Sequence, residues 1–370
     1  MQKILLMPNA FKGSLSAGDF CRIAAKTLRG KSLIKCCPVS DGGDGIIEVF
    51  KTLSPKSKLY FVNVIDAVYK KHKAPFLILP DGKTCIIETA KVCGLAGISK
   101  EDLNPLGATS FGIGQVILAA AKKGAKTFFI GLGGVACNDG GAGMAMALGF
   151  ELLDDENSAI PLGASGLLSL AKIKSRPQFL KKLKFIGLSD VKNPLLGKNG
   201  SAAVYGPQKG ANKKEVATLE KSLKNYARVV KKDFGLNINV ARAGAAGAIA
   251  SGILGLLNGK LEDGAPFILN QLKAEALIKK ANFVIATEGQ LDEQTFYGKA
   301  PQAVCLLAKK HRKPVVFICG VNKIKNKKLL KKNGNSQVFA FSDYAKNKED
   351  SIKNASYYLK KLLQIFGEKF

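Results

Sequence analysis

Six acidic residues of this chain follow short apolar runs and stand beside glycines, where a carboxylate could do chemistry: Asp41, Asp44, Asp139, Asp190, Glu288 and Asp292. In an open α/β sheet, the residues that follow the strands gather at one edge, and ligands bind there. Transfer of a phosphoryl group from a magnesium nucleotide needs carboxylates for the metal ion, together with lysines and N–H donors for the phosphates. The pattern predicts such a site, although each acid taken alone fits an ordinary turn equally well.

Residues 126–150 are the most distinctive stretch. The apolar run 128–130 predicts a buried strand, six glycines follow within thirteen residues, and small apolar residues after them favour a packed helix. Glycines let the backbone approach an anion closely, and a helix N-terminus offers free N–H groups. We expect this loop to bind phosphate and to display Asn138 and Asp139 to solvent or to a ligand. The alternative is a glycine-rich turn that only closes a tight connection from strand to helix.

The same loop raises a second class of protein. Gly131-x-Gly133-x-x-Ala136 fits the loose glycine pattern of dinucleotide-binding folds, which would indicate a nicotinamide dehydrogenase. That class needs an acidic ribose ligand at the end of the next strand, and no clean second strand ending in Asp or Glu follows. The chain has no GxxxxGK[ST] loop.

Two further loops carry polar groups. Lys12 lies in the loop 9–17 after the first expected strand, and Ser16 is a suitable N-cap for the helix that follows. The turn 41–45 places two aspartates among glycines, which fits a magnesium or sugar-hydroxyl site. It also fits a plain turn, because Asp and Gly are common turn residues.

Strands must position these loops. Apolar runs predict strands over 3–8, 33–38, 58–65, 75–79, 84–89, 128–130, 185–190 and 315–319, and another that begins at Phe283. Residues 80–83 predict a hairpin turn, residues 212–232 a long amphipathic helix, and residues 243–257 a buried helix. Strands that alternate with helices indicate an α/β protein.

Length and composition exclude several classes. A chain of 370 residues suits two domains, and an apolar fraction of 46% is ample for folded cores. No run of 18 strongly apolar residues occurs, and the first residues lack a signal-peptide pattern, so we expect no membrane partner. The eight cysteines form no CxxC pair, which favours free thiols in a reducing cytoplasm. With only two histidines, a common zinc site or a Ser-His-Asp triad has little support.

The formal net charge of +29 permits a nucleic-acid partner. The lysines, however, are concentrated in amphipathic segments such as 323–332 and 346–361 and are not interleaved with aromatic residues in an RNA- or DNA-binding motif. We favour a lysine-rich solvated surface and keep a basic nucleic-acid-binding protein as the rival from another class.

Several blocks of the sequence resemble the bacterial glycerate kinase family of the glycerate 2-kinase type. They occur in family order and cover nearly the whole chain: Phe11-Lys12-Gly13-Ser14-Leu15-Ser16-Ala17, Asp41-Gly42-Gly43-Asp44-Gly45, Gly131 to Met144, Asp190-Val191-Lys192-Asn193-Pro194-Leu195, Tyr205 to Ala211, Gly244-Ala245-Ala246-Gly247 and Glu288 to Pro301. The blocks at 131–144, 205–211 and 288–301 are the most specific.

The resemblance implies a cytoplasmic kinase that phosphorylates D-glycerate with ATP and Mg²⁺, usually to 2-phosphoglycerate. It also implies two α/β domains with the active site in the cleft between them. One is Rossmann- or flavodoxin-like with a parallel sheet, formed by residues 1–70 and 282–370. The other is a mixed α/β domain, residues 71–281, which contains the glycine-rich stretch. The oligomeric state is left open, with a homodimer as one option.

On this basis we assign hypothetical roles. The catalytic candidates are Asp190, as the base toward the acceptor hydroxyl or else a metal ligand, and Lys12, for the glycerate carboxylate or the transferred phosphoryl group. The candidates for binding substrate or nucleotide are Ser14, Gly133, Gly134, Asn138, Asp139, Asn193, Lys209 and Gly289. The candidates for Mg²⁺ or substrate hydroxyls are Asp41, Glu288 and Asp292.

The chain departs from the family pattern at several positions. Asn9 stands where the family commonly has Asp, Val135 where it has Ser, Cys137 where it has Thr, and Gln290 where it has Arg, and Arg242-Ala243 replaces Pro-Gly. Because Asn9 replaces a carboxylate and Gln290 replaces an arginine, the alternative that the chain is a diverged kinase for another small hydroxy-acid stays open.

Overall fold

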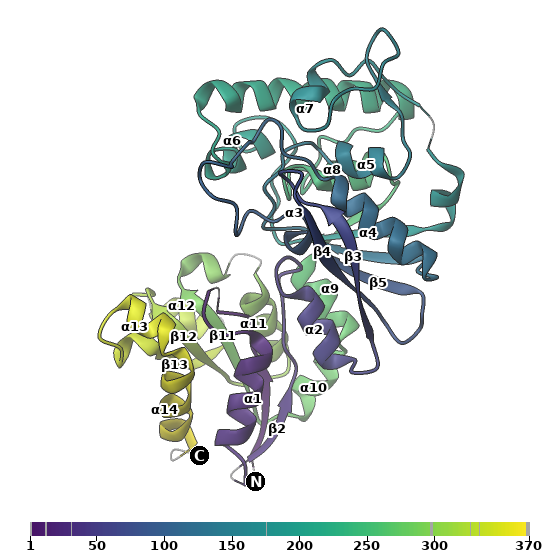
Figure 1. The fold of residues 1–370 in the computed structure, drawn as a ribbon. Coiled ribbons are helices and arrows are strands. Elements are labelled where there is room, and N and C mark those ends of the chain that lie inside the picture. The colour runs from purple at the N-terminus through teal and green to yellow at the C-terminus, as the bar shows by residue number, and fades with distance from the viewer. Residues whose placement is uncertain are drawn as a thin grey trace. The chain divides into compact units, whose positions relative to one another are not determined.

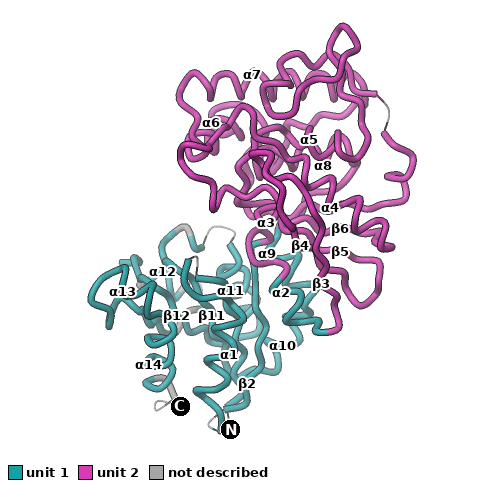
Figure 2. The backbone as a smooth tube through the Cα atoms, viewed as in Figure 1, with its two compact units in different colours: residues 1–41, 48–55, 264–370 teal, residues 42–47, 56–263 magenta. Residues whose placement is uncertain are grey.

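The structure is a computed structural model that describes residues 2–11, 13–30, 32–174, 176–296, 299–325, 327–332 and 334–367. The chain divides into two compact units (Figure 2), unit 1 with residues 1–41, 48–55 and 264–370, and unit 2 with residues 42–47 and 56–263. The boundaries expected from the sequence are 70/71 and 281/282. Residues 58–65 belong to unit 2 because they pair with residues 71–78 in its sheet. Within the described parts of the chain, no helix combines the length and the apolar character needed to cross a membrane.

Unit 1 contains a five-stranded parallel sheet in the order β13-β12-β11-β1-β2. Its strands are β1 (Gln2–Met7), β2 (Ser32–Cys36), β11 (Phe283–Leu291), β12 (Val315–Asn322) and β13 (Asn335–Ala340). Numbered within the unit, the order is 2-1-3-4-5, which is the flavodoxin-like order. The predicted flavodoxin-like fold with a parallel sheet is confirmed. The strand order reverses between β1 and β11, so a ligand crevice is expected beyond their carboxyl ends.

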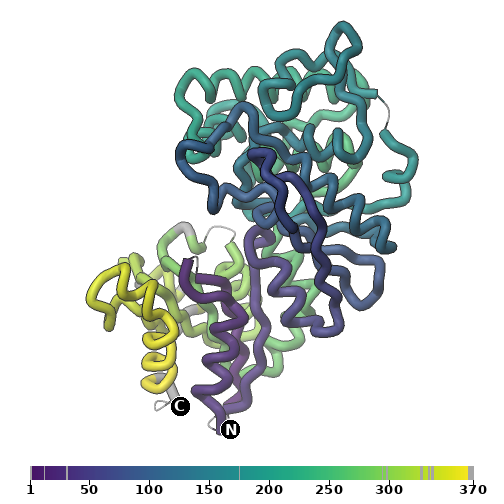
Figure 3. Tube along the Cα trace, in the orientation of Figure 1, coloured from purple at the N-terminus to yellow at the C-terminus, as the bar shows by residue number. Residues whose placement is uncertain are grey.

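Helices cover both faces of this sheet (Figure 1). Ile4 and Leu6 of β1 pack in one cluster with residues of α1 (Ala17–Thr27) and α14 (Ala355–Gly367). Leu5 and Met7 pack in another with residues of α9 (Gly264–Gln271), α10 (Ala274–Lys280) and α11 (Ala300–Lys310). This alternation follows from the two-residue period of a strand. The beginning and the end of the chain therefore form one core, as the purple and yellow segments show (Figure 3).

The helices that end in unit 1 have the following bounds: α1 (Ala17–Thr27), α2 (Ile46–Leu53, which begins in unit 2), α9 (Gly264–Gln271), α10 (Ala274–Lys280), α11 (Ala300–Lys310), α12 (Lys327–Lys332), α13 (Lys348–Lys353), α14 (Ala355–Gly367), and the 3₁₀ turns η4 (Glu293–Phe296) and η5 (Phe341–Asp343). Ser16 caps α1 as predicted, because its side chain accepts a hydrogen bond from the Asp19 amide at 3.1 Å.

Unit 2 contains a six-stranded mixed sheet in the order β10-β9-β6-β5-β4-β3, as predicted for the mixed α/β domain. Its strands are β3 (Lys58–Ile65), β4 (Lys71–Ile78), β5 (Thr84–Glu88), β6 (Thr127–Gly131), β9 (Lys184–Ser189) and β10 (Lys260–Asp263). The four strands from β10 to β5 are parallel, and β4 and β3 continue the sheet antiparallel. The predicted hairpin turn joins β4 to β5, where the Asp81 carboxylate accepts from the amides of Lys83 and Thr84. A separate two-stranded antiparallel sheet pairs β7 (Leu152–Leu153) with β8 (Lys172–Ile173).

The helices of unit 2 are α3 (Ala90–Cys93), α4 (Phe111–Lys122), α5 (Ala142–Ala147), α6 (Ser201–Tyr205), α7 (Lys213–Phe234) and α8 (Ile249–Gly255), with 3₁₀ turns η1 (Ser165–Leu168), η2 (Gln178–Lys182) and η3 (Pro207–Lys209). The long helix is confirmed as α7, which begins with a capping box of Asn212 and Glu215. The buried helix predicted over 243–257 is wrong in its first half. Residues 242–248 form turns in which Arg242, Ala246 and Ala248 have positive φ, and the helix begins at Ile249.

Candidate functional site

The glycine-rich stretch after β6 is packed tightly against its own unit. A Cβ atom at Gly131 would lie 2.6 Å from the carbonyl oxygen of Gly42, and one at Gly143 would lie 2.2 Å from Thr109 Oγ1. Real Cβ atoms do not approach other atoms this closely, so glycine is required at both positions. The glycines here permit close packing of β6 and α5 on neighbouring loops.

Asp139 holds this stretch together from inside. Its side chain is fully buried, and its carboxylate accepts hydrogen bonds from the Ser110 amide and hydroxyl at 2.8 Å and from the Gly141 and Gly143 amides at 3.1 Å. Burial raises the pKa of Asp139, and these donors oppose the rise. The carboxylate therefore occupies the place at the start of α5 that an incoming anion would need.

Further amides of the loop also donate to protein acceptors. The Gly133 amide donates to Thr89 Oγ1 at 3.3 Å, the Gly140 amide to the Gly247 carbonyl at 3.2 Å, and the Met144 amide to Ser110 Oγ at 2.9 Å. Asn138 and Asp139 are not displayed to solvent, since both side chains are fully buried. The alternative reading, a turn that closes a tight connection, describes residues 139–144 better than a phosphate cradle. Sequence patterns could not separate the two, because both need glycine for close approach.

The buried side chain of Lys209 hydrogen-bonds to Asn138. Lys209 Nζ donates to the Cys137 carbonyl at 2.6 Å and to Asn138 Oδ1 at 3.1 Å. Burial lowers the pKa of Lys209 to about 8. Gly247 makes room for this amine, because a Cβ there would lie 2.8 Å from Nζ. Asn138 Nδ2 is buried and has no hydrogen-bond partner among the described residues, so the pair retains one donor for a ligand.

Asp190 directly follows β9 and stands near a bonded pair of side chains. The Tyr205 hydroxyl donates to Asn193 Oδ1, and Asn193 Nδ2 donates to the Asn199 carbonyl, both at 2.8 Å. Burial and the charge of Asp190 raise the pKa of Tyr205 to about 12. Tyr205 thus orients Asn193 and fixes the loop after Asp190. We did not predict a role for Tyr205, although it opens one of the blocks that resemble the family.

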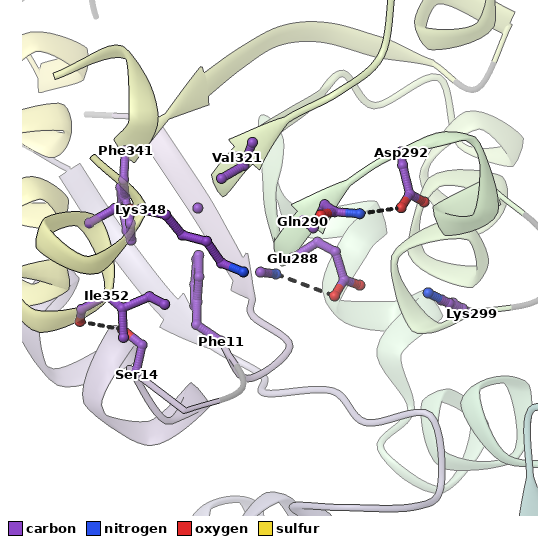
Figure 4. Close-up of a pocket in the computed structure, with 13 residues that line it drawn as sticks. Phe11, Ser14, Glu288, Gln290, Asp292, Lys299, Val321, Phe341, Lys348 and Ile352 are labelled. Atoms are coloured by element: carbon purple, nitrogen blue, oxygen red, sulfur yellow. Dashed lines mark hydrogen bonds between the residues drawn. The ribbon is translucent and has the colours of Figure 1, made fainter. Parts of the chain in front are cut away.

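Unit 1 has its own pocket, about 420 Å³ in volume, at the predicted crevice (Figure 4). Its lining comes from the loop after β1, the ends of β11 and β12, and residues near α11 and α13: Phe11, Ser14, Glu288, Gly289, Gln290, Asp292, Lys299, Gly320, Val321, Phe341, Lys348, Ser351 and Ile352. Four predicted site residues, Ser14, Glu288, Gly289 and Asp292, are therefore brought together. Lys348 and Phe341 could not be found from sequence, because they enter the site from the lysine-rich C-terminal part.

Glu288 is the most unusual group in this pocket. Burial, helped by the negative charge of Asp41, raises the pKa of Glu288 to about 7, and Lys299 opposes the rise. Glu288 Oε1 accepts from the Gly289 amide at 3.3 Å, whereas Oε2 is buried without a partner among the described residues. A buried, unpartnered carboxylate oxygen costs free energy, which a bound cation or hydroxyl donor would recover.

Asp41 and Asp292 have structural partners. Asp41 accepts a hydrogen bond from the Ala300 amide at the start of α11. Asp292 accepts from Gln290 Nε2 at 2.7 Å and from the Thr295 amide at 3.2 Å. Over the described ranges, no three His, Cys, Asp or Glu side chains lie close enough together to hold a metal ion. A three-carboxylate cage of Asp41, Glu288 and Asp292 is therefore absent. Mg²⁺ is usually held by one or two carboxylates plus substrate phosphates, which Glu288 with its neighbour Asp41 would suit.

The remaining predicted residues are distributed as follows. Lys12 lies outside the described residues. Ser14 Oγ donates to the Ile352 carbonyl at 3.0 Å, which ties the loop after β1 to α13. Gly134 is exposed with a φ of +63°, beside Asp44. Of the six acids, Asp41, Glu288 and Asp292 belong to unit 1, and Asp44, Asp139 and Asp190 to unit 2.

The flavodoxin-like sheet, the mixed sheet and the pocket at the strand ends define a two-unit α/β protein with a pocket at a topological switch point. The chain belongs to the glycerate kinase family, whose model matches residues 4–368. It is 35% identical to a glycerate kinase of Halalkalibacterium halodurans, with 86% of each chain covered. It is 36% identical to the glycerate 2-kinase of Escherichia coli K12, over 86% of this chain and 85% of the relative.

A solved structure agrees with these relatives. The crystal structure of a Salmonella typhimurium LT2 protein described as glycerate kinase 2 superposes with a TM-score of 0.86 at 30% identity. The superposition covers 100% of this chain and 98% of that one. Family membership makes the chain a kinase that acts on glycerate.

Proposed function

We propose that the chain phosphorylates D-glycerate with ATP and releases 2-phosphoglycerate and ADP. The observation that carries the proposal is the family match over residues 4–368, which includes both the pocket of unit 1 and the Lys209–Asn138 pair of unit 2. The glycerate 2-kinase among the relatives supports the 2-isomer as product.

Charge and hydrogen bonding suit the residues to this reaction. Asp190 takes the proton as the acceptor oxygen of glycerate bonds to the γ-phosphorus. The bond from that phosphorus to its bridging oxygen breaks, and ADP leaves with the electron pair. Lys209 and the free amide donor of Asn138 bind an anionic oxygen of a substrate. Glu288 and Asp41 would hold Mg²⁺, which would neutralise charge on the phosphates.

A coupled ADP-release assay with Mg-ATP and D-glycerate, read out by separating the 2- and 3-phosphoglycerate isomers, tests the proposal. Formation of 2-phosphoglycerate is the expected result. Exclusive formation of the 3-isomer would refute the regiochemistry and leave the kinase assignment intact. Absence of ADP release with glycerate would refute the substrate.

A second candidate, a kinase for another small hydroxy-acid, rests on Gln290. This residue stands where the family commonly has Arg, lines the unit 1 pocket, and donates to Asp292 at 2.7 Å. Higher kcat/KM with a hydroxy-acid other than glycerate in the same assay would favour it. We also propose a cytoplasmic location, in keeping with the eight free thiols.

A further inference from the structure

The unit 1 pocket lies at the switch point of its sheet. Strand order reverses between β1 and β11, and the pocket is lined by residues after β1, such as Phe11, and by residues in the carboxyl end of β11, such as Glu288. Open α/β sheets of this order bind mononucleotides at that place. The position alone does not choose between nucleotide and glycerate.

The volume of the pocket favours the larger ligand. Its volume is about 420 Å³. Glycerate has seven non-hydrogen atoms, and at about 30 Å³ for each, the volume of a water molecule in the liquid, it needs at most roughly 210 Å³. It would fill no more than about half of the pocket, whereas ligand pockets normally enclose most of a ligand's surface.

The pocket lining is divided by polarity. Val321, Phe341 and Ile352 form an apolar part, with Phe341 stacked on Phe11 at 5.2 Å between ring centroids. Lys348 extends into the pocket from α13, and Lys299 lies beside the Glu288 carboxylate (Figure 4). A ligand with a flat apolar end and an anionic end fits this division. Glycerate has no apolar end.

Residues 139–144 of the glycine-rich stretch are poorly suited to bind the phosphates of a nucleotide. The amides of Gly140, Gly141, Gly143 and Met144 all donate to protein acceptors, and the Asp139 carboxylate occupies the start of α5. Phosphates would have to displace a buried carboxylate that receives four hydrogen bonds. That exchange is unfavourable.

We infer that the unit 1 pocket binds a nucleoside di- or triphosphate, with the base against Val321 and Ile352 and the phosphates toward Lys299 and Lys348. The inference rests on the proposed kinase function, because that function requires a nucleotide site. The nucleotide site then lies at the carboxyl ends of the unit 1 strands and not at the glycine-rich loop, where the sequence pattern predicts phosphate binding.

Two variants test separately the contacts expected for the base and for the phosphates. Ile352→Glu places a carboxylate on the apolar part at a side chain that is 42% exposed, and Lys348→Ala removes a cation. Leu306→Glu is the matched control, because Leu306 is 54% exposed on α11 and does not line the pocket. The probes are Mg-ADP, adenosine and D-glycerate, each titrated separately by calorimetry, with circular dichroism as the check on folding.

We expect Ile352→Glu to weaken both ADP and adenosine about tenfold, as loss of one well-packed contact would. Lys348→Ala should weaken ADP about tenfold and leave adenosine unchanged, because only ADP carries phosphates. Leu306→Glu should leave all three unchanged. Weaker glycerate binding with normal ADP binding in the two pocket variants would overturn the inference in favour of a glycerate site. Normal binding of every probe would also overturn it.

These outcomes are independent of the proposed reaction. If the wild-type chain binds ADP in this pocket but forms no ADP from ATP in the presence of glycerate, the proposed function fails and the inference stands. If the wild type phosphorylates glycerate while both pocket variants keep their affinity for ADP, the inference fails and the function stands.

Discussion

Replacement of Glu288 by Gln should stabilise the protein at alkaline pH and leave it nearly unchanged at acidic pH. Glu288 has a folded-state pKa of about 7, against 4.5 for the unperturbed group, chiefly because it is buried. A carboxyl group whose pKa is higher in the folded state binds more protons when folded. The free energy of unfolding therefore falls as pH rises from 4.5 through 7, and stays low above 7.

The size of the effect follows from the shift. Each pKa unit corresponds to about 1.4 kcal/mol, so the rise from 4.5 to about 7 would cost about 3 kcal/mol above pH 7. Because the side chain retains some exposure, solvent screening reduces this to about 2 kcal/mol. For a unit of this size, about 2 kcal/mol corresponds to a melting-temperature difference of roughly 4–8 °C. E288Q should show that difference from wild type at pH 8 and little at pH 4.5.

Thermal melts followed by circular dichroism at several pH values between 4 and 8 measure this difference. Glu275→Gln is the control with the opposite sign, because Lys310 and His311 lower the pKa of Glu275 to about 2. That variant should melt below wild type at pH 7, with the difference fading as the pH approaches 2. If E288Q and wild type differ equally at pH 4.5 and pH 8, Glu288 does not titrate as the structure indicates, and its unpartnered oxygen is neutralised by something else.

Three further predictions address unit 2. The kcat/KM of the wild type should fall above pH about 8, as the buried Lys209 amine loses its proton, and a flat profile up to pH 9.5 would contradict its role. Asp190→Asn should lower turnover by roughly 10³-fold, the contribution of a base with its electrostatics, while Asp155→Asn, at an exposed acid, keeps normal turnover. Gly143→Ala should reduce the free energy of unfolding by about 3 kcal/mol in urea titrations, whereas Gly43→Ala, with only ordinary contacts at 3.6 Å, should cost less than about 1 kcal/mol.

Much of the fold could be predicted from local patterns. Strands such as β6 and β9 are short apolar runs bounded by turn residues, and the Asn212 cap defines the start of α7. The turns at 242–248 could not be predicted, because small residues suit a helix as well as a packed loop. Their positive φ values are imposed by partners far along the chain, such as the Asn193 carbonyl that accepts from the Gly244 amide.

The sequence predicts which residues belong to the candidate site better than it predicts the role of each one. Ser14, Glu288 and Asp292 share one pocket as expected, because the carboxyl ends of parallel strands meet at one edge of the sheet. Asp139 looked like a ligand-binding acid for the same reason, yet it binds Ser110 and the amides of its own loop. Only the tertiary structure distinguishes an acid that receives four protein donors from one with a buried oxygen that has no hydrogen-bond partner among the described residues.

Asp139 and Glu288 differ in what a bound ligand would add to their hydrogen bonding. Asp139 has its charge balanced by hydrogen bonds within the protein, so a ligand would gain little by approaching it. Glu288 has one oxygen that is buried without a partner in the described structure. Burial of this unpaired oxygen destabilises the ligand-free protein. Binding that supplies a partner to this oxygen recovers the cost, and the recovered free energy contributes to affinity. E288Q should therefore lose affinity for Mg-ADP while it gains stability above pH 7. A variant that gains stability and keeps its full affinity would show that the unpartnered oxygen has no role in binding.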